Sequence, residues 1–300
     1  MSILNRPSIQ SFKGCLTGLA LGDALGAPFE GLPPGNYRPD CRSPLIYTDD
    51  TEMMINLARA LTEVEEPSTA TIARYFAEGL NPERGYGEGA LRVLGLVREG
   101  MAVERAVRAV FPEGSYGNGA AMRVAPVGLL YWQDEERIKE MVERSAHATH
   151  VHPLAVEGAM MIALSIGYIL RGGERTGLIE YLLGRAETEE FRGSLRKCLS
   201  SVLKGIDEGW VVKELGNSVA AHRSVPAAVY SFVMLGDDFM GLVRFCVSLG
   251  GDTDTISAMA GALSGALLGM EGLPVDCIRR LEHQALIESL AERLYDKATG

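Results

Sequence analysis

The chain has 300 residues, of which 47% are hydrophobic, and it carries a formal net charge of −10. The hydrophobic content is enough for a large core, and the length is compatible with one compact helical domain. The negative charge argues against nonspecific binding to nucleic acid or to an anionic membrane surface, because both depend on basic surface. We therefore expect neither of these as a partner.

The cysteines and the N-terminus indicate a cytoplasmic protein. Five scattered cysteines form no C-x-x-C pair, which predicts free thiols in a reducing compartment and no zinc site; they are Cys15, Cys41, Cys198, Cys246 and Cys277. The first residues lack the apolar segment of a signal peptide. The most apolar stretch, residues 256–270, is too short to span a bilayer, and we interpret it as a buried core helix.

The chain begins with a predicted helix over residues 9–25, where apolar side chains recur at three- and four-residue spacing. Its glycines, Gly14, Gly18 and Gly22, recur every four residues and would let a neighbouring helix pack closely. Residues 31–47 contain four prolines and little periodicity, which predicts an irregular loop. Because long loops in compact domains are usually functional or disordered, we expect this one to form a rim or lid of the functional site.

Most of the remaining chain is predicted to be helical. A helix follows Pro67, and two short helices lie within residues 89–111. Further helices are predicted at residues 135–147, 154–171, 176–186, 190–205, 224–236, 238–249 and 274–297, the last either continuous or broken. Strand-like alternation and a linker between domains are both missing from the pattern. We therefore predict an all-α fold, a single compact orthogonal bundle of about a dozen or more helices over residues 1–300.

Two clusters of Asp and Thr, about 200 residues apart, each precede an apolar helical run. The first is Thr48-Asp-Asp-Thr51, and the second is Asp252-Thr-Asp-Thr255. Either cluster alone is compatible with an ordinary helix cap and an acidic first turn. Together they could offer four carboxylates and several hydroxyls to one two-metal site. Oxygen ligands at this density favour Mg²⁺, Mn²⁺ or Ca²⁺ over zinc.

Two shorter motifs lie between the clusters. Gly117-Asn-Gly-Ala120 precedes a helix start, and such a glycine-rich turn can hold a phosphate group, although most turns of this kind do not. The stretch Thr149-His-Val-His-Pro153 has two histidines at positions i and i+2, which do not share a helix face. Because His152 precedes a proline, we expect it to terminate or cap a helix.

In this order the motifs resemble those of the ADP-ribosylglycohydrolase family. The matching stretches also include Gly14–Gly31, and the similarity runs from about residue 12 to about residue 270. The resemblance implies the same all-α fold. It also implies an enzyme that hydrolyses the glycosidic bond between ADP-ribose and a modified target, expected to be a protein side chain.

The resemblance further implies roles for individual residues. Two divalent cations, Mg²⁺ or Mn²⁺, are the expected cofactors, with Asp254 bridging both and Thr253 pointing away. Their expected ligands are Thr48, Asp49, Asp50, Asp252, Asp254 and Thr255. The catalytic candidates, whose individual roles stay open, are Glu30, Asp49 and Asp50. Expected contacts with ADP-ribose come from Tyr116, Gly117, Asn118, Gly119, Ala120 and His150.

Residues 80–90 correspond to a family loop near the ribose and its attached group, with Tyr86 and Glu88 as candidates for contact. The role of Arg123 stays open.

Two other functions are compatible with the sequence. A non-catalytic relative could keep the fold and bind ADP-ribose or serve a structural role, but the intact Asp/Thr clusters and Glu30 disfavour it. Without the resemblance, the oxygen clusters would also fit a two-metal phosphohydrolase acting on a nucleotide. The sequence leaves open the linkage that is cleaved (arginine, serine, nucleic acid or small molecule) and the choice between Mg²⁺ and Mn²⁺. A monomer is the default expectation.

Overall fold

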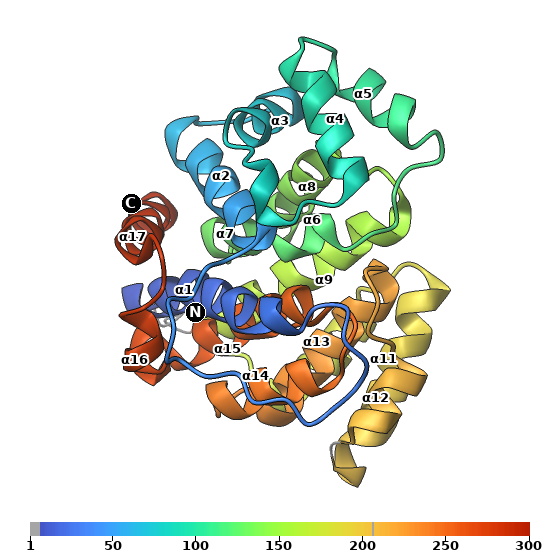
Figure 1. Ribbon diagram of the computed structural model, residues 1–300, viewed down its shortest axis with the longest axis vertical. Helices are drawn as coiled ribbons and strands as arrows, with labels where there is room; N and C mark the ends of the chain where they lie inside the picture. Colours follow the sequence, from blue (N-terminus) through green and yellow to red (C-terminus); the bar gives the residue numbers. More distant parts are fainter. Residues whose placement is uncertain (1–6, 206) are drawn as a thin grey trace.

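The computed structural model describes residues 7–205 and 207–300 and shows a bundle of helices that cross at many angles (Figure 1). Over these residues the secondary structure is helical apart from two isolated β-bridges, which confirms the predicted all-α class. The α-helices are α1 (Ile9–Gly26), α2 (Asp49–Glu63), α3 (Thr69–Glu78), α4 (Glu88–Arg98), α5 (Val103–Val110), α6 (Gly119–Met122), α7 (Ala125–Leu130), α8 (Glu135–Ala146), α9 (Pro153–Leu170), α10 (Leu178–Leu183), α11 (Glu189–Ser201), α12 (Glu208–Glu214), α13 (Ala221–Leu235), α14 (Phe239–Ser248), α15 (Thr253–Leu268), α16 (Val275–Ile278) and α17 (Gln284–Thr299). Short 3-10 helices are η1 (Ala27–Phe29), η2 (Pro82–Arg84), η3 (Arg175–Gly177), η4 (Val202–Lys204) and η5 (Met270–Gly272).

Helix starts follow the expected capping chemistry. The side chains of Ser68 and Asp134 accept hydrogen bonds from N–H groups in the first turns of α3 and α8, where no carbonyl of the helix is available. His152 caps α9 in the same way, by accepting from the N–H of Leu154, as predicted. The C-terminal segment is broken into α16 and α17.

The helices α1 and α15 pack with their backbones in contact. A Cβ atom on Gly18 would collide with the carbonyl oxygen of Gly261, and one on Gly14 would collide with that of Gly265. Gly22 faces a carbonyl oxygen of α15 in the same way. The predicted thin face of the first helix is therefore confirmed, and its partner is the helix that carries the second Asp/Thr cluster.

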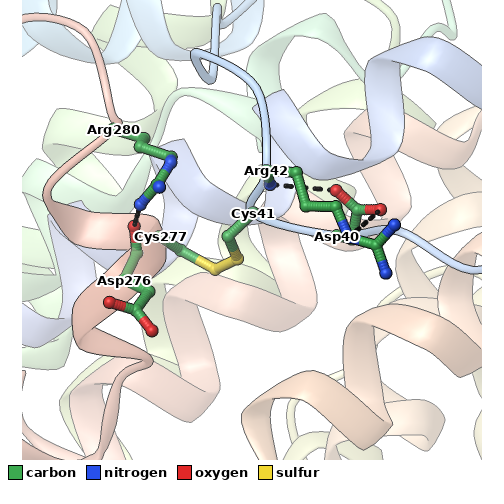
Figure 2. The surroundings of a disulfide bond; sticks show 6 residues. All are labelled: Asp40, Cys41, Arg42, Asp276, Cys277 and Arg280. Carbon is green, nitrogen blue, oxygen red and sulfur yellow. Dashed lines mark hydrogen bonds and ion pairs between the residues drawn. A yellow bond between two sulfur atoms is a disulfide. The ribbon is translucent and has the colours of Figure 1, made fainter.

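The loop over residues 31–47 does not cover the pocket described below, whose lining residues include none of them. It extends instead to the C-terminal segment, where Leu45 forms a β-bridge with Leu281 and Cys41 forms a disulfide with Cys277 (Figure 2). The prediction that all five cysteines are free was therefore wrong for this pair, whose Cα atoms lie 4.9 Å apart. Their separation of 236 residues hid the pairing. The three other cysteines are free and buried, and they are Cys15, Cys198 and Cys246.

Helix α9 is the one helix in the described ranges that is long and apolar enough to cross a membrane by length and composition alone, with a mean hydropathy of 1.7 over 18 residues. Within the fold, 72% of this segment is buried. It packs against α6, α7, α8, α13 and α15, so it serves as a core helix. The single domain, the cytoplasmic location and the lack of membrane association stay predictions.

Replacing Gly18 by alanine should destabilise the protein. Alanine favours a helix by roughly 1 kcal/mol over glycine, but its methyl group would push α1 away from the backbone of α15. Overpacking of this kind costs about 1–3 kcal/mol, so we expect a net decrease in the free energy of unfolding, measured by urea denaturation. The control is Gly95→Ala in α4, where a Cβ would meet no atom within 4 Å and stability should rise. Equal behaviour of the two variants would contradict the packing argument.

Candidate active site

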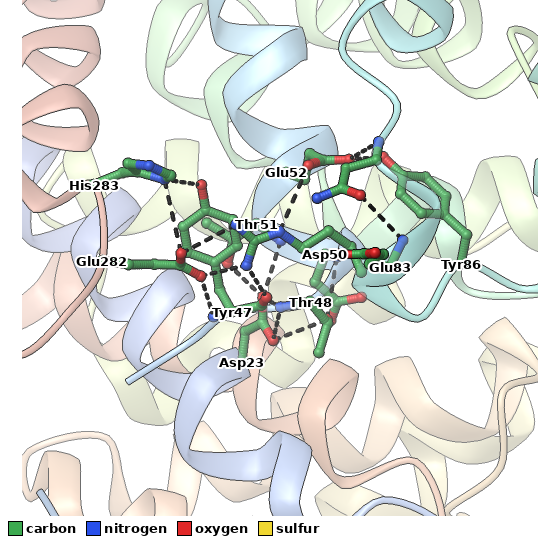
Figure 3. Close-up of polar contacts among 12 residues, drawn as sticks. Asp23, Tyr47, Thr48, Asp50, Thr51, Glu52, Glu83, Tyr86, Glu282 and His283 are labelled. Carbon is green, nitrogen blue, oxygen red and sulfur yellow. Dashed lines mark hydrogen bonds and ion pairs between the residues drawn. The ribbon is translucent and has the colours of Figure 1, made fainter. Parts of the chain in front are cut away.

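The last turn of α1 holds the start of α2. The buried carboxylate of Asp23 accepts hydrogen bonds from the backbone N–H and the hydroxyl of Thr48, at 3.0 and 2.9 Å. It accepts the same pair from Thr51, at 3.0 and 2.5 Å (Figure 3). Four donors on one carboxylate orient the start of α2, and Asp49 and Asp50 line a pocket there.

The start of α15 is held by the same end of α1. The hydroxyl of Thr253 donates to the carbonyl oxygen of Gly26 at 3.0 Å, so this side chain points away from the pocket, as predicted. Asp252 occupies the N-cap position, but its carboxylate accepts no backbone N–H of its own helix. Together with Asp254 it lines the pocket. The second cluster is therefore more than a helix cap.

The two clusters meet across the pocket. The hydroxyl of Thr255 lies 3.4 Å from a carboxylate oxygen of Asp50. Glu30, Asp252 and Asp254 each place one carboxylate oxygen within 4.8 Å of the others, a grouping that could hold a metal ion. Glu30 is exposed whereas the two aspartates are buried, so it lies at the open side of this group.

Arg123 is the one Lys or Arg among the described residues that line this cavity; its charge acts on Asp49, but the two groups form no ion pair. Over the described residues, no Lys or Arg forms an ion pair with any of the six carboxylates at this site, which are Asp23, Glu30, Asp49, Asp50, Asp252 and Asp254. Burying a charged carboxylate without a positive partner costs free energy, and such a group tends to take up a proton instead. The site is therefore arranged for a positively charged ligand.

The pKa values follow from this crowding. Burial, and next the charge of Asp23, raise the pKa of Asp49 to about 7. Burial and Asp252 raise the pKa of Asp254 to about 9. Burial also raises the pKa of Asp50 well above its ordinary value, and burial and Asp252 raise that of Glu30. A bound cation would reverse these shifts, because it favours the charged carboxylates.

The glycine-rich turn before α6 lies beside the acids. The side-chain amide of Asn118 donates to the hydroxyl of Ser224 at 2.9 Å and also to the carboxylate of Asp252. Its backbone N–H donates to the carbonyl oxygen of Val219 at 2.8 Å. Asn118 therefore ties the turn to the acidic cluster, and both hydrogens of its amide are already used.

The acids, the glycine-rich turn and a second loop enclose a cavity of about 260 Å³. Gly117 and Gly119 form one wall, and Gly85 and Gly87 form another. His150 also lines the cavity and packs against the first wall, because a Cβ on Gly119 would approach its ring to 2.7 Å. A larger surface hollow of about 550 Å³ is lined by residues such as Arg244 and Phe245 and includes none of these acids.

This geometry can be compared with known proteins. A profile of the family described as ADP-ribosylglycohydrolase matches residues 5–300. The chain belongs to the ADP-ribosylglycohydrolase family. The predicted resemblance is therefore confirmed, and with it the assignment of the chain to the glycohydrolases.

Relatives and solved structures agree with this assignment. The chain is 34% identical to a Gallus gallus protein named ADP-ribosylhydrolase ARH3, over 97% of this chain and 94% of the relative. It is 33% identical to the protein of the same name in Homo sapiens, over 96% and 93% of the two chains. A solved structure titled "ADP-ribosylglycohydrolase-related protein complex" matches with a TM-score of 0.79 and 27% identity, over 97% of this chain and 99% of that one.

The residues expected to contact ADP-ribose occupy different depths in this ADP-ribosylglycohydrolase. Gly117, Asn118, Gly119 and His150 line the cavity. Tyr116 does not; it is 54% exposed, and its ring lies 5.7 Å from that of His152 and 6.3 Å from that of His222. Ala120 is buried beneath the turn. Contact with ADP-ribose stays a prediction for all six residues.

The glycines of the loop over residues 80–90 line the cavity, and its larger side chains bind to residues outside the loop, as Figure 3 shows for Tyr86 and Glu52. The guanidinium of Arg84 forms an ion pair with Glu282 and donates to the carbonyl oxygen of Tyr47 at 2.8 Å. The hydroxyl of Tyr86 donates to Glu52 at 2.7 Å. Tyr86 is therefore a support of the loop, and Glu88 is exposed outside the cavity lining.

Several residues that support the site have a role that no local motif indicates. Asp23 was visible near the end of the first helix, but its four donors come from residues 25 and 28 positions later. Asn217, whose carbonyl oxygen accepts from the backbone N–H of Asp252 at 2.9 Å, lies in a stretch without a motif. The one usable signal in the sequence was an aspartate, Asp23, at the end of an otherwise apolar, glycine-rich helix.

Without cations, the acids should weaken the fold as the pH rises. The raised pKa values mean that the folded chain binds more protons than the unfolded chain, whose aspartates titrate near about 3.9. The free energy of unfolding therefore falls with pH up to the folded pKa, by at most about 1.4 kcal/mol per pH unit for each proton.

The measurement is thermal unfolding in EDTA between about pH 6 and pH 9, with Asp254→Asn as the comparison. The cation-free variant should gain stability relative to the native chain as the pH rises, because it lacks one of these carboxylates. Saturating Mg²⁺ should raise the unfolding temperature of the native chain more than that of the variant. A stability difference that does not change with pH would contradict the raised pKa of Asp254.

Proposed function

We propose that this chain uses two divalent cations to hydrolyse a glycosidic bond at the ribose of an ADP-ribosylated target and to release ADP-ribose. The observation that carries the proposal is the meeting of two acidic helix starts beside a glycine-rich turn in one cavity. The names of the ARH3 relatives support ADP-ribose as the sugar that is released. We propose a protein side chain as the target.

The residues present suit hard cations. One carboxylate oxygen of Asp50 is buried without any hydrogen-bond partner among the described residues, as expected of an oxygen that serves as a metal ligand. The hydroxyl of Thr48 donates to Asp23, and that of Thr255 donates to Asp50. The Thr48 oxygen also accepts from the backbone N–H of Asp50 at 3.4 Å, so each oxygen still has at least one lone pair for a cation. We propose as ligands Thr48, Asp49, Asp50, Asp252, Asp254 and Thr255. Bound ions would orient the ribose hydroxyls and lower the pKa of a water ligand.

Glu30 is the best-placed group to act on the bond itself. It lies at the open side of the cluster. Its carboxyl is only partly buried, and this partial burial, with the charge of Asp252, raises its pKa. A carboxylate there can take a proton from an attacking water, or stabilise the positive charge that develops on the sugar ring. Asp49 and Asp50 are held deeper by the start of α2, which suits them to fixed ligation.

The glycine-rich turn is proposed to hold the diphosphate. The N–H groups of Gly117, Asn118 and Ala121 already donate to Ser115, Val219 and Asn118. Those of Gly119 and Ala120, at the start of α6, donate to no described residue, as is usual in the first turn of a helix, and the turn at Gly117 and Gly119 has no side chains to block an approach. Because the amide of Asn118 is already engaged by Ser224 and Asp252, we assign its side chain to orienting Asp252. The oxygen of the Asn118 side-chain amide stays available as an acceptor, whereas its backbone carbonyl already accepts from Ala121 and Met122.

The activity can be tested with arginine-linked, serine-linked and nucleic-acid-linked ADP-ribose, each with Mg²⁺, Mn²⁺ or EDTA. We expect release of intact ADP-ribose from at least one substrate, and its loss in EDTA, detected by mass spectrometry. Release of AMP or phosphate would favour a two-metal phosphohydrolase. Binding of ADP-ribose without any release would favour a binding protein, and both results would contradict the proposal.

Glu30→Gln should separate binding from turnover. The amide keeps the size of the side chain but cannot accept a proton, so turnover should fall by about 10²-fold or more while the Kd for ADP-ribose stays within a few-fold of the native value. Glu88→Gln is the matched control, because Glu88 is exposed and lies outside the cavity lining. Turnover near the native rate in Glu30→Gln would remove Glu30 from the mechanism.

A further inference from the structure

A buried arginine lies in the wall of the cavity, next to Thr149 and His150. Arg123 follows α6, is fully buried and forms no ion pair with another described residue. Its guanidinium donates to the carbonyl oxygen of Ser145 at 2.8 Å and to the hydroxyl oxygen of Thr149 at 2.9 Å, and it lies 4.4 Å from the ring centre of Phe76. Burying a charged guanidinium without an ion-pair partner costs free energy. The position of Arg123 therefore needs a functional explanation, which its hydrogen-bond partners can supply.

The hydroxyl of Thr149 has two neighbours and only one hydrogen. It is buried, it accepts from Arg123, and it lies 2.7 Å from Nδ1 of His150. Arg123 cannot accept a hydrogen bond, so the hydroxyl hydrogen must go to His150 if it is to be used at all. If Nδ1 carried a proton instead, Thr149 would accept twice, and its own hydrogen would be buried without an acceptor beside a positive charge, which is unfavourable.

We infer that Arg123 and Thr149 form a relay that holds His150 as a neutral imidazole with its proton on Nε2. A neutral imidazole carries one proton, so a hydrogen bond received at Nδ1 leaves that proton on the other nitrogen. Burial, with the nearby charge of Arg123, lowers the pKa of His150 to about 3, which agrees with a neutral ring. Arg123 and Thr149 are positioning residues in this scheme.

The free N–H of His150 faces the glycine-rich turn. Nε2 makes no hydrogen bond to a described residue, and Cβ atoms on Gly119 and Gly117 would lie 3.1 and 3.4 Å from it. Both glycines and His150 line the cavity. An oxygen with negative or partial negative charge is therefore the ligand group that Nε2–H can bind, whereas the opposite tautomer would present a lone pair and repel it.

This inference rests on the proposed function only for the identity of the ligand, where a phosphate oxygen of ADP-ribose is the expected acceptor. The protonation of the ring belongs to the free protein. The two parts can therefore fail separately.

The first test is nitrogen NMR of the protein labelled at histidine, in Mg²⁺, with His150→Gln used to assign the signal among the five histidines. We expect one-bond proton coupling at Nε2 of His150 and none at Nδ1. A proton on Nδ1 would overturn the relay whatever the protein binds. This result is decisive even if the native chain binds no ADP-ribose, which would contradict the proposed function alone.

The second test compares Thr149→Val with Thr149→Ser. Valine keeps the shape but removes the hydroxyl, so the ring should lose its tautomer preference, and the Kd for ADP-ribose should rise about tenfold or more, as for loss of one hydrogen bond to a charged group. Serine should restore most of the affinity and the Nε2–H signal. Equal Kd values and unchanged ring signals in Thr149→Val would overturn the relay. Unfolding temperatures of the two variants will show whether both are folded.

Discussion

The contact between the backbones of α1 and α15 is the constraint on which the site depends. Glycines on both helices remove the side chains that would separate them, and Gly26 lies so close to the start of α15 that a Cβ there would come within 2.6 Å of the Cα of Asp254. The end of α1 then holds two other helices. Asp23 binds the start of α2, and the carbonyl oxygen of Gly26 binds the hydroxyl of Thr253. One rigid helix therefore sets the distance between both acidic clusters.

The acids collected in this way are unfavourable for the folded chain alone. Burial and mutual repulsion raise the pKa values of Asp49, Asp50 and Asp254, and no Lys or Arg over the described residues forms an ion pair with them. A core built only for stability would pair or replace these groups. Their presence at the starts of α2 and α15 is explained by a ligand of opposite charge, and membership in the ADP-ribosylglycohydrolase family agrees with this.

Local patterns in the sequence predicted the parts of the structure that depend on neighbouring residues. Periodicity located the long helices, the four-residue glycine spacing predicted the close helix contact, and the Asp/Thr clusters predicted the acidic site. Apart from the meeting of the two Asp/Thr clusters, contacts between distant segments were missed, because no local pattern records them. The disulfide between Cys41 and Cys277 spans 236 residues. The side-chain amide of Asn118 donates a hydrogen bond to Asp252, which lies 134 residues away in the sequence.

The central claim is that the two helix starts together bind a pair of cations. The most direct measurement is anomalous diffraction from crystals grown with Mn²⁺. The account predicts two peaks in the cavity about 3.5–4 Å apart, with Asp254 in contact with both and Asp50 in contact with at least one. A single peak, or peaks bound away from the starts of α2 and α15, would contradict it.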